Sequence, residues 1–197
     1  MKRSDLLAAA AIALGLAGGS AAPIWAAGDR IVIGVLGDHS SAYADIGGPK
    51  LVEAVKMAAE EAGGEVGGRK IEVIWADSQL KPDVAASITR KWFEADGVDV
   101  VVDLPSTAMA LSVGQLAEEF DKVALLTSAG GSNLTNKDCR PNSVHWTYDT
   151  YGIAHSIGRA LAESGKKKWF FITADYAFGT QLENDATAVL KETGGEV

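Results

Sequence analysis

Hydroxyl-bearing, glycine and other small residues gather where four apolar runs of this sequence end. They occupy the segments Asp38–Ile46, Ala76–Gln79, Leu104–Thr107 and Thr127–Ser132. Hydroxyl groups and uncovered backbone N–H groups form hydrogen bonds with small polar solutes, and the positive end of a helix favours a carboxylate. The chemistry that these residues indicate is therefore reversible binding of a small molecule.

Two of these segments carry the clearest signal for a ligand. Ser106 and Thr107 stand where a helix is expected to begin, so their hydroxyls would lie beside free N–H groups. In Ser128–Gly131 the small side chains let a ligand approach the backbone closely. A plain helix cap at Ser106 and an ordinary turn at the glycines explain the same residues, and both alternatives stay open here.

Several aromatic residues fall in loops or at expected helix starts, where a ring can stack on a ligand. They are Tyr43, Tyr148, Tyr151, Tyr176 and Phe178. Packing against the rest of the protein is an equally valid interpretation of each one. Trp75, Trp92 and Trp169 lie in strand or helix patterns instead, so we expect them in the core.

Motifs for catalysis, cofactors and metals are absent from the sequence. It has no G-x-G-x-x-G or G-x-x-x-x-G-K-[ST] phosphate loop, no G-x-S-x-G nucleophile turn and no H-E-x-x-H pair. His39, His145 and His155 lack the spacing of metal ligands. Asp38 beside His39 would suit acid–base chemistry, but a solvated loop explains this pair better. We therefore expect no enzyme activity, no cofactor and no metal site.

A regular alternation of strand and helix patterns must position these segments. The expected strands are Ile31–Leu36, Lys70–Ala76, Val98–Leu104, Lys122–Thr127, a short extended segment at Val144–Tyr148, and a long strand at Lys168–Ala174. The expected helices begin at Pro49, at Pro82, at Ser106, at Asp149 or Thr150, and at Phe178. This order predicts an α/β fold with a doubly wound parallel sheet, whose ligand site lies at the carboxyl ends of the strands.

The N-terminal residues have the layout of a secretory signal peptide. Lys2 and Arg3 precede an apolar core at Leu6–Leu16, and small residues follow it as far as Ala26-Ala27. A spanning helix needs about 20 strongly apolar residues, so a retained membrane anchor is the less favoured alternative. We expect residues 1–26 to be removed and the mature chain to be a soluble protein of the periplasm.

Charge and cysteine content narrow the range of partners. Residues 1–26 contain Lys2, Arg3 and Asp5, so the totals of 18 basic and 26 acidic residues fall to 16 and 25 in the mature chain. No basic stripe remains to neutralise phosphates, and we expect no nucleic-acid partner. Cys139 is the single cysteine, so it is either an inert thiol or pairs with a cysteine outside this sequence.

The order of strands and helices divides the mature chain unequally. We expect residues 28–147 to form a first ligand-binding lobe. Residues 148–197 are expected to form a crossover and the first strand–helix unit of a second, incomplete lobe. Glu196-Val197 have the pattern of the first step of a further strand.

At its loops the sequence resembles the type I periplasmic solute-binding proteins of the leucine/isoleucine/valine-binding family. The resemblance runs from about Ile31 to Val197. It rests on Ile33–Val35, Ser40, Tyr43–Gly47, Gly68–Val73, Asp77–Gln79, Thr127–Thr135 and Ala174–Gly179. His145–Asp149 and Trp169–Phe171 make the chain more similar to a branch that is associated with aromatic and other organic acids as well as amino acids.

The resemblance implies the binding component of an ABC-type importer, which delivers its ligand to a membrane permease. A small amino acid or an aromatic or organic acid would be held between two lobes by hinge closure. The loops that match Ser106-Thr107 and Ser128–Gly131 would hold the carboxylate and any amino group, and a ring at Tyr176 or Phe178 would close over them. The expected ligand-binding residues are Ser40, Ser41, Tyr43, Ser106, Thr107, Ser128, Ala129, Gly130, Gly131, Tyr148, Asp149, Tyr176 and Phe178.

One departure from the family and two alternative functions complete the prediction. Gly131 stands where many members carry a threonine that contacts the ligand's polar group, which bears on amino-acid specificity. An extracellular sensor domain of the same fold would need a membrane helix and a signalling domain further along the chain. A secreted α/β enzyme would need a nucleophile or an acid–base pair, which the loops do not supply.

Overall fold

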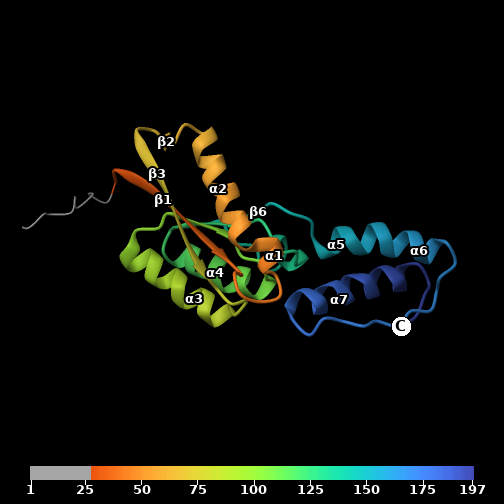
Figure 1. The fold of residues 1–197 in the computed structure, drawn as a ribbon. Helices are drawn as coiled ribbons and strands as arrows, with labels where there is room; N and C mark the ends of the chain where they lie inside the picture. The colour runs from red at the N-terminus through yellow and green to blue at the C-terminus, as the bar shows by residue number, and fades with distance from the viewer. Residues whose placement is uncertain (1–27) are drawn as a thin grey trace, which may run out of the picture.

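A six-stranded, mostly parallel sheet forms the larger part of the protein (Figure 1). The computed structural model describes residues 28–197, so the predicted signal peptide lies outside the described residues. In spatial order the strands are β2 (Glu65–Val66), β3 (Arg69–Asp77), β1 (Arg30–Gly37), β4 (Val100–Asp103), β5 (Val123–Leu126) and β6 (Ser143–His145). The short β2 runs antiparallel to β3, and the other pairs in this sheet are parallel. The predicted doubly wound α/β fold is confirmed.

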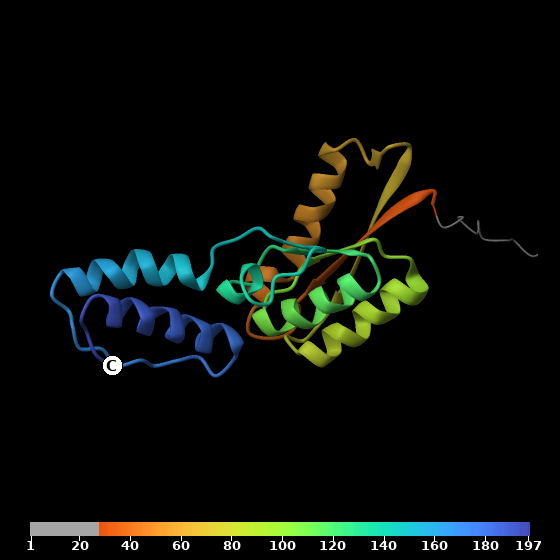
Figure 2. The same ribbon diagram turned by 180° about the vertical axis from the view of Figure 1, so that it is seen from behind.

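Helices cover both faces of this sheet (Figure 2). α2 (Pro49–Glu61) lies against one face, while α3 (Pro82–Lys91) and α4 (Thr107–Glu119) pack together on the other. Pro49 and Pro82 stand in the first turns of α2 and α3, where the missing N–H has no intrahelical partner to lose. The predicted starts of these helices are therefore confirmed.

Strand β1 occupies the point at which the winding of the sheet reverses. It pairs with β3 along one edge and with β4 along the other. The chain that leaves β1 turns toward α2, whereas the chain that leaves β4 turns toward α4 on the opposite face. Loops that diverge in this way leave a crevice at the carboxyl ends of the two strands. Leu36 pairs with Asp103, so β1 and β4 end at nearly the same level beside that crevice.

The main core fills the space between the sheet and the α3–α4 layer. Its buried members include Val32, Leu36, Val101, Met109, Val113, Ala117 and Leu126. The turn η1 (Trp92–Asp96) adds Trp92, which is buried as predicted and packs on Gly34 of β1. A Cβ at residue 34 would lie 2.6 Å from the indole ring, so a glycine is required there.

Residues 150–197 form a pair of helices beyond β6 (Figures 1 and 2). α5 (Thr150–Ile153), η3 (Ala154–Gly158) and α6 (Arg159–Glu163) follow one another in a continuous helical stretch alongside α7 (Ala177–Glu192). Ala154, Ala186 and Val189 form a small core between them, against which Trp169 and Phe171 pack. Within residues 28–197 no helix has the length and apolar character that crossing a membrane requires.

The predicted strand at Lys168–Ala174 is wrong in the structure. Its one ladder contact among the described residues is a parallel bridge between Lys168 and Glu196. Phe170 and Ile172 are 88% and 96% exposed, while Trp169 and Phe171 face α7. The side chains thus alternate as in a strand, but an apolar run becomes part of a sheet only where another strand satisfies its backbone groups.

The third predicted strand is also shorter than expected. Val98–Leu104 was the expected range, whereas β4 covers Val100–Asp103. Asp103 and Leu104 have φ angles of 94° and 63°, in the left-handed region that non-glycine residues rarely adopt. The ladder ends there, and the chain bends sharply into the loop before α4.

We predict that Gly34→Ala destabilises the protein by about 1–3 kcal/mol, because the added methyl group overpacks the core against Trp92. Urea unfolding followed by circular dichroism measures this change. Gly158→Ala is the control, since its added Cβ meets the nearest side chain at an ordinary 3.6 Å and alanine favours a helix. Equal stabilities of Gly34→Ala and the wild type would contradict this account of the core.

Candidate ligand-binding site

A cavity of about 130 Å³ lies at the crevice between β1 and β4. Its walls come from the loop after β1, the start of α4, the loop after β5, the crossover after β6 and the start of α7. The lining residues are Tyr43, Ile46, Pro105, Ser106, Thr107, Ser128, Gly130, Tyr148, Tyr176 and Phe178. Most residues predicted from the sequence therefore meet at one place, and both halves of the described chain contribute to it.

The start of α4 supplies the polar end of this cavity. Ser106 is the N-cap, and its hydroxyl accepts a hydrogen bond of 3.3 Å from the N–H of Met109. The hydroxyl oxygen of Thr107 is buried and has no hydrogen-bond partner among the described residues. The first N–H groups of a helix have no intrahelical acceptor, and the helix dipole makes this end positive. An anionic group in the cavity would therefore lie near the Thr107 side chain and the positive end of α4.

The loop after β5 forms a second wall, and its backbone at Gly130 and Gly131 lies close to the side chains of neighbouring segments. A Cβ at Gly130 would lie 2.8 Å from the Tyr148 ring and 3.0 Å from the Phe178 ring. A Cβ at Gly131 would lie 2.4 Å from the methyl group of Thr107. Any larger side chain at position 131, threonine included, would therefore collide with Thr107.

Aromatic side chains close the cavity from the opposite side. The hydroxyls of Tyr43 and Tyr176 lie 2.5 Å apart, and this hydrogen bond joins the loop after β1 to the start of α7. Phe178 stacks on Tyr176 with 6.1 Å between ring centroids and meets Tyr148 edge-on at 6.5 Å. Burial and the contact with Tyr43 raise the pKa of Tyr176, so its hydroxyl stays neutral and available for hydrogen bonding.

The loop after β1 is organised around a buried carboxylate. Asp38 is fully buried and accepts hydrogen bonds from the N–H groups of Ser40, Ser41 and Tyr43 and from the Ser41 hydroxyl. Burial raises the pKa of Asp38, but these four hydrogen bonds outweigh burial and hold the pKa below its ordinary value. The predicted solvated loop at Asp38-His39 is therefore wrong: the carboxylate shapes the turn that carries Tyr43 and α1 (Ala44–Gly47) into the cavity wall.

Ser40 and Ser41 use their hydroxyls inside this loop instead of lining the cavity. Ser41 donates to Asp38, and Ser40 donates to Asp77 at the end of β3, each at 2.6 Å. Trp75, which we expected in the core, is 56% exposed and stacks on His39 with 4.6 Å between ring centroids. Ser40, Ser41 and Trp75 therefore all lie outside the cavity lining.

Three more predicted residues also lie outside the cavity lining. Ala129 is buried, and its carbonyl accepts a hydrogen bond from His145. Gly131 packs against Thr107 and precedes η2 (Ser132–Thr135). Asp149 caps α5 by accepting a 2.6 Å hydrogen bond from the N–H of Gly152. Each has a structural partner, and of these the sequence indicated only the helix start at Asp149.

Sequence reasoning missed Ile46 and Pro105 in the cavity lining, and Asp103 behind it. Asp103 is fully buried, and one of its oxygens accepts a hydrogen bond from Ser128. Burial raises the pKa of Asp103 to about 7, the Ser128 hydroxyl opposes this rise, and the nearby charge of Asp38 adds to it. The signal in the sequence was an acidic residue at the end of an apolar strand, directly before Leu104-Pro105.

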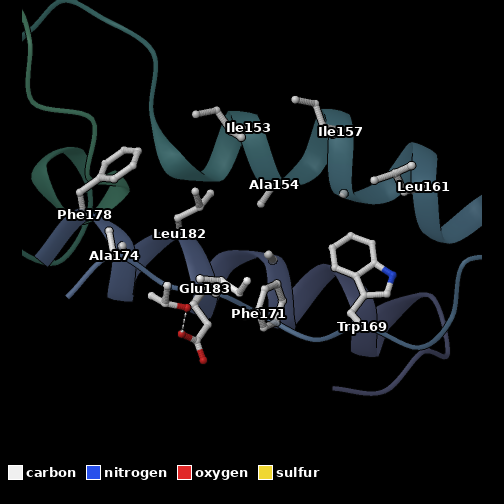
Figure 3. Close-up of a pocket in the computed structure, with 15 residues that line it drawn as sticks. Ile153, Ala154, Ile157, Leu161, Trp169, Phe171, Ala174, Phe178, Leu182 and Glu183 are labelled. Atoms are coloured by element: carbon white, nitrogen blue, oxygen red, sulfur yellow. Dashed lines mark hydrogen bonds between the residues drawn. The ribbon is translucent and has the colours of Figure 1, made fainter. Parts of the chain in front are cut away.

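A larger and mostly apolar groove of about 350 Å³ lies between the α5–α6 stretch and α7 (Figure 3). Ile153, Ile157 and Leu161 line it from the α5–α6 stretch, and Trp169, Phe171 and Leu182 lie on the α7 side. The hydroxyl of Thr173 and the carboxylate of Glu183 bond each other at 2.5 Å. A solute site needs placed polar groups that are free to select the ligand, so the cavity at the β1–β4 crevice is the better candidate.

We predict that Asp38→Asn destabilises the protein by about 1–3 kcal/mol at pH 7, because the amide N–H₂ faces donors where a carboxylate accepted them. The folded pKa of Asp38 lies below its ordinary value, so the stabilisation is present above about pH 4 and disappears as the pH falls further. Urea unfolding at pH 7 and pH 3 measures both effects. Asp45→Asn, at an exposed position of α1, is the control; an equal loss in both variants would contradict the account.

Comparison with known proteins gives the context of this site. The family model described as periplasmic binding protein matches residues 30–197. A solved periplasmic binding protein from Burkholderia mallei is 46% identical with a TM-score of 0.81, covering 85% of this chain and 44% of that one. A solute-binding protein from Rhodopseudomonas palustris BisB5, solved with 3,4-dihydroxybenzoic acid, is 27% identical with a TM-score of 0.75, covering 85% of this chain and 46% of that one.

Curated relatives agree with these matches. The Leu/Ile/Val-binding protein homolog 4 of Brucella abortus is 28% identical over 149 residues, which are 70% of this chain and 35% of that protein. The chain thus spans less than half the length of the relatives that it matches. Since the family model covers most of the sequence and the fold agrees, the chain belongs to the periplasmic binding protein family.

Proposed function

We propose that this chain is part of a solute-binding protein that captures a small carboxylate for an ABC-type importer. The observation that carries the proposal is Thr107 at the N-terminus of α4: the residue lines the cavity, and its buried hydroxyl has no protein partner among the described residues. A buried polar atom without a partner costs free energy, and a bound carboxylate would supply the missing acceptor. The Ser106 cap and the positive end of α4 support the same anion.

The aromatic walls favour a ligand that carries a ring or another flat apolar group. Phe178 and Tyr148 meet edge-on beside Gly130, and Tyr43 and Tyr176 place their hydroxyls at the same cavity. A volume of about 130 Å³ suits a small solute, since one liquid water occupies about 30 Å³. Aromatic and other organic acids are therefore the preferred ligand class, in line with the dihydroxybenzoic acid in the R. palustris relative.

Capture would bring together the two halves of the chain. Tyr43 and the α4 start belong to residues 28–147, whereas Tyr176 and Phe178 belong to residues 148–197. The Ser132 hydroxyl donates to Asp185 of α7 at 2.8 Å, and the Thr150 N–H donates to the carbonyl of Gly130 at 2.8 Å, so the two halves also contact each other beside the cavity-lining Gly130. We propose that these halves are the first lobe and the beginning of the second, which close about a hinge at the crossover.

Location and partner follow from the same proposal. Removal of the predicted signal peptide at residues 1–26 would release the protein into the periplasm. A membrane permease would then accept the loaded protein, and no chemical step on the ligand is needed. Secretion of a fusion of residues 1–28 to a reporter enzyme would test the export signal.

Isothermal titration tests the site with the complete product of the reading frame that contains this chain. Benzoate, 3,4-dihydroxybenzoate and leucine are the probes, and we predict one bound carboxylate per protein. Thr107→Val should weaken binding about 10- to 100-fold, because a hydrogen bond to a charged group contributes about 1.5–3 kcal/mol. Its stability should not fall, since no protein partner is lost.

Thr127→Val is the matched control for this variant. The Thr127 hydroxyl is also buried without a partner among the described residues, but it does not line the cavity. Its affinity for the same probes should equal that of the wild type. Equal weakening in both variants, or no binding of any probe to the wild type, would refute the proposed function.

A further inference from the structure

Asp103 places a buried carboxyl group directly behind the candidate ligand site. The residue is fully buried at the end of β4, in a backbone conformation with φ of 94°. One carboxyl oxygen accepts a hydrogen bond from the Ser128 hydroxyl, and Ser128 lines the cavity. The Ser128 hydroxyl is therefore shared between this carboxyl group and the space that a ligand would fill.

The second carboxyl oxygen of Asp103 is buried and has no partner among the described residues. It lies where Gly37 and Gly47 make room for it, since a Cβ at these residues would approach it to 2.9 and 3.0 Å. Glycines at both positions leave space for the carboxyl group without giving it a donor. A buried carboxylate oxygen without a donor is poorly stabilised, so this place favours the protonated form of the Asp103 carboxyl group.

The charged surroundings of Asp103 also favour the protonated form. Among the described residues no lysine or arginine forms an ion pair with it, and the acid whose charge acts on it is Asp38, whose hydrogen bonds keep it ionised. His39 is the other titratable group on this side, because its Nε2 would lie 3.3 Å from a Cβ at Gly37. Burial and the charge of Asp38 raise the pKa of Asp103 to about 7, while the Ser128 hydroxyl opposes the rise.

We propose that Asp103 is a positioning residue that couples the capture of a carboxylate ligand to the uptake of one proton. The inference rests on the proposed function, because it concerns the anion expected at the same cavity. While Asp103 is ionised, Ser128 donates its proton inward and presents only lone pairs to the cavity. An arriving carboxylate then meets an acceptor, and its own charge becomes the third negative charge beside those of Asp38 and Asp103.

Protonation of Asp103 reverses the direction of this hydrogen bond. The proton comes from solvent and binds the carboxyl oxygen of Asp103 that faces Ser128, and this O–H then donates to the Ser128 oxygen. Ser128 becomes free to donate its own proton to the ligand carboxylate. The balance is one ligand anion and one proton taken up by the ionised protein, with no covalent bond formed or broken between protein and ligand. By linkage, affinity for the anion rises as the pH falls toward 7.

Isothermal titration of the complete protein with benzoate, in buffers of different ionisation enthalpy at pH 8, tests this inference directly. We expect an uptake of close to one proton per bound ligand, and a Kd that rises up to about tenfold per pH unit above pH 7. 3,4-Dihydroxybenzoate serves as a second probe. Binding without proton uptake, with the same Kd from pH 6 to pH 9, would overturn the inference and leave the proposed function standing.

Two variants assign the proton to its residue. Asp103→Asn should abolish proton uptake and flatten the pH profile of Kd, because an amide can donate to Ser128 without titrating. His39→Gln should retain the full uptake, and its loss there would assign the proton to His39 and overturn the inference. The wild-type measurement stands even where Asp103→Asn fails to fold. If no carboxylate probe binds at any pH, the proposed function fails and this inference fails with it.

Discussion

The parallel pairing of β1 with β3 on one edge and β4 on the other is the constraint on which the candidate site depends. Leu36 is level with Ala76 on one side and with Asp103 on the other, so three strands end together. Their loops must then leave toward opposite faces of the sheet, which opens a crevice between them. Every polar group that lines the cavity from the first half of the chain is delivered by a loop that starts at this edge.

Two buried carboxylates shape that edge in different ways. Asp38 receives a full set of hydrogen bonds and fixes the turn that carries Tyr43. Asp103 accepts one hydrogen bond, from Ser128, and burial raises its pKa to about 7. A satisfied buried charge rigidifies its surroundings, whereas an under-satisfied one responds to what binds beside it. Asp38 therefore fixes the shape of the cavity wall, and Asp103 is the residue that we propose takes up a proton when a ligand binds.

The sequence allowed the sheet and much of the cavity lining to be predicted because both follow from local patterns. Apolar runs ending in Leu36, Leu104 and Thr127 located the strand ends to within one residue. The Ser106-Thr107 hydroxyl pair located the cap of α4. The predicted residues that line the cavity are thus located, while their contact with a ligand stays a prediction. Lys168–Ala174 shows the limit of such patterns: its side chains alternate correctly, but strand pairing depends on a neighbouring backbone.

Buried polar groups could not be predicted in this way, because their partners come from distant segments. Ser40 and Ser41 carry hydroxyls suited to a ligand, yet these hydroxyls donate hydrogen bonds to Asp77 and Asp38.

A crystal structure of the complete protein with benzoate would test carboxylate binding at the start of α4 most directly. We predict a carboxylate oxygen within hydrogen-bond distance of the Thr107 hydroxyl, with the ring beside Tyr148 and Phe178. A ligand bound in the apolar groove between α5–α6 and α7, or away from Thr107, would contradict it.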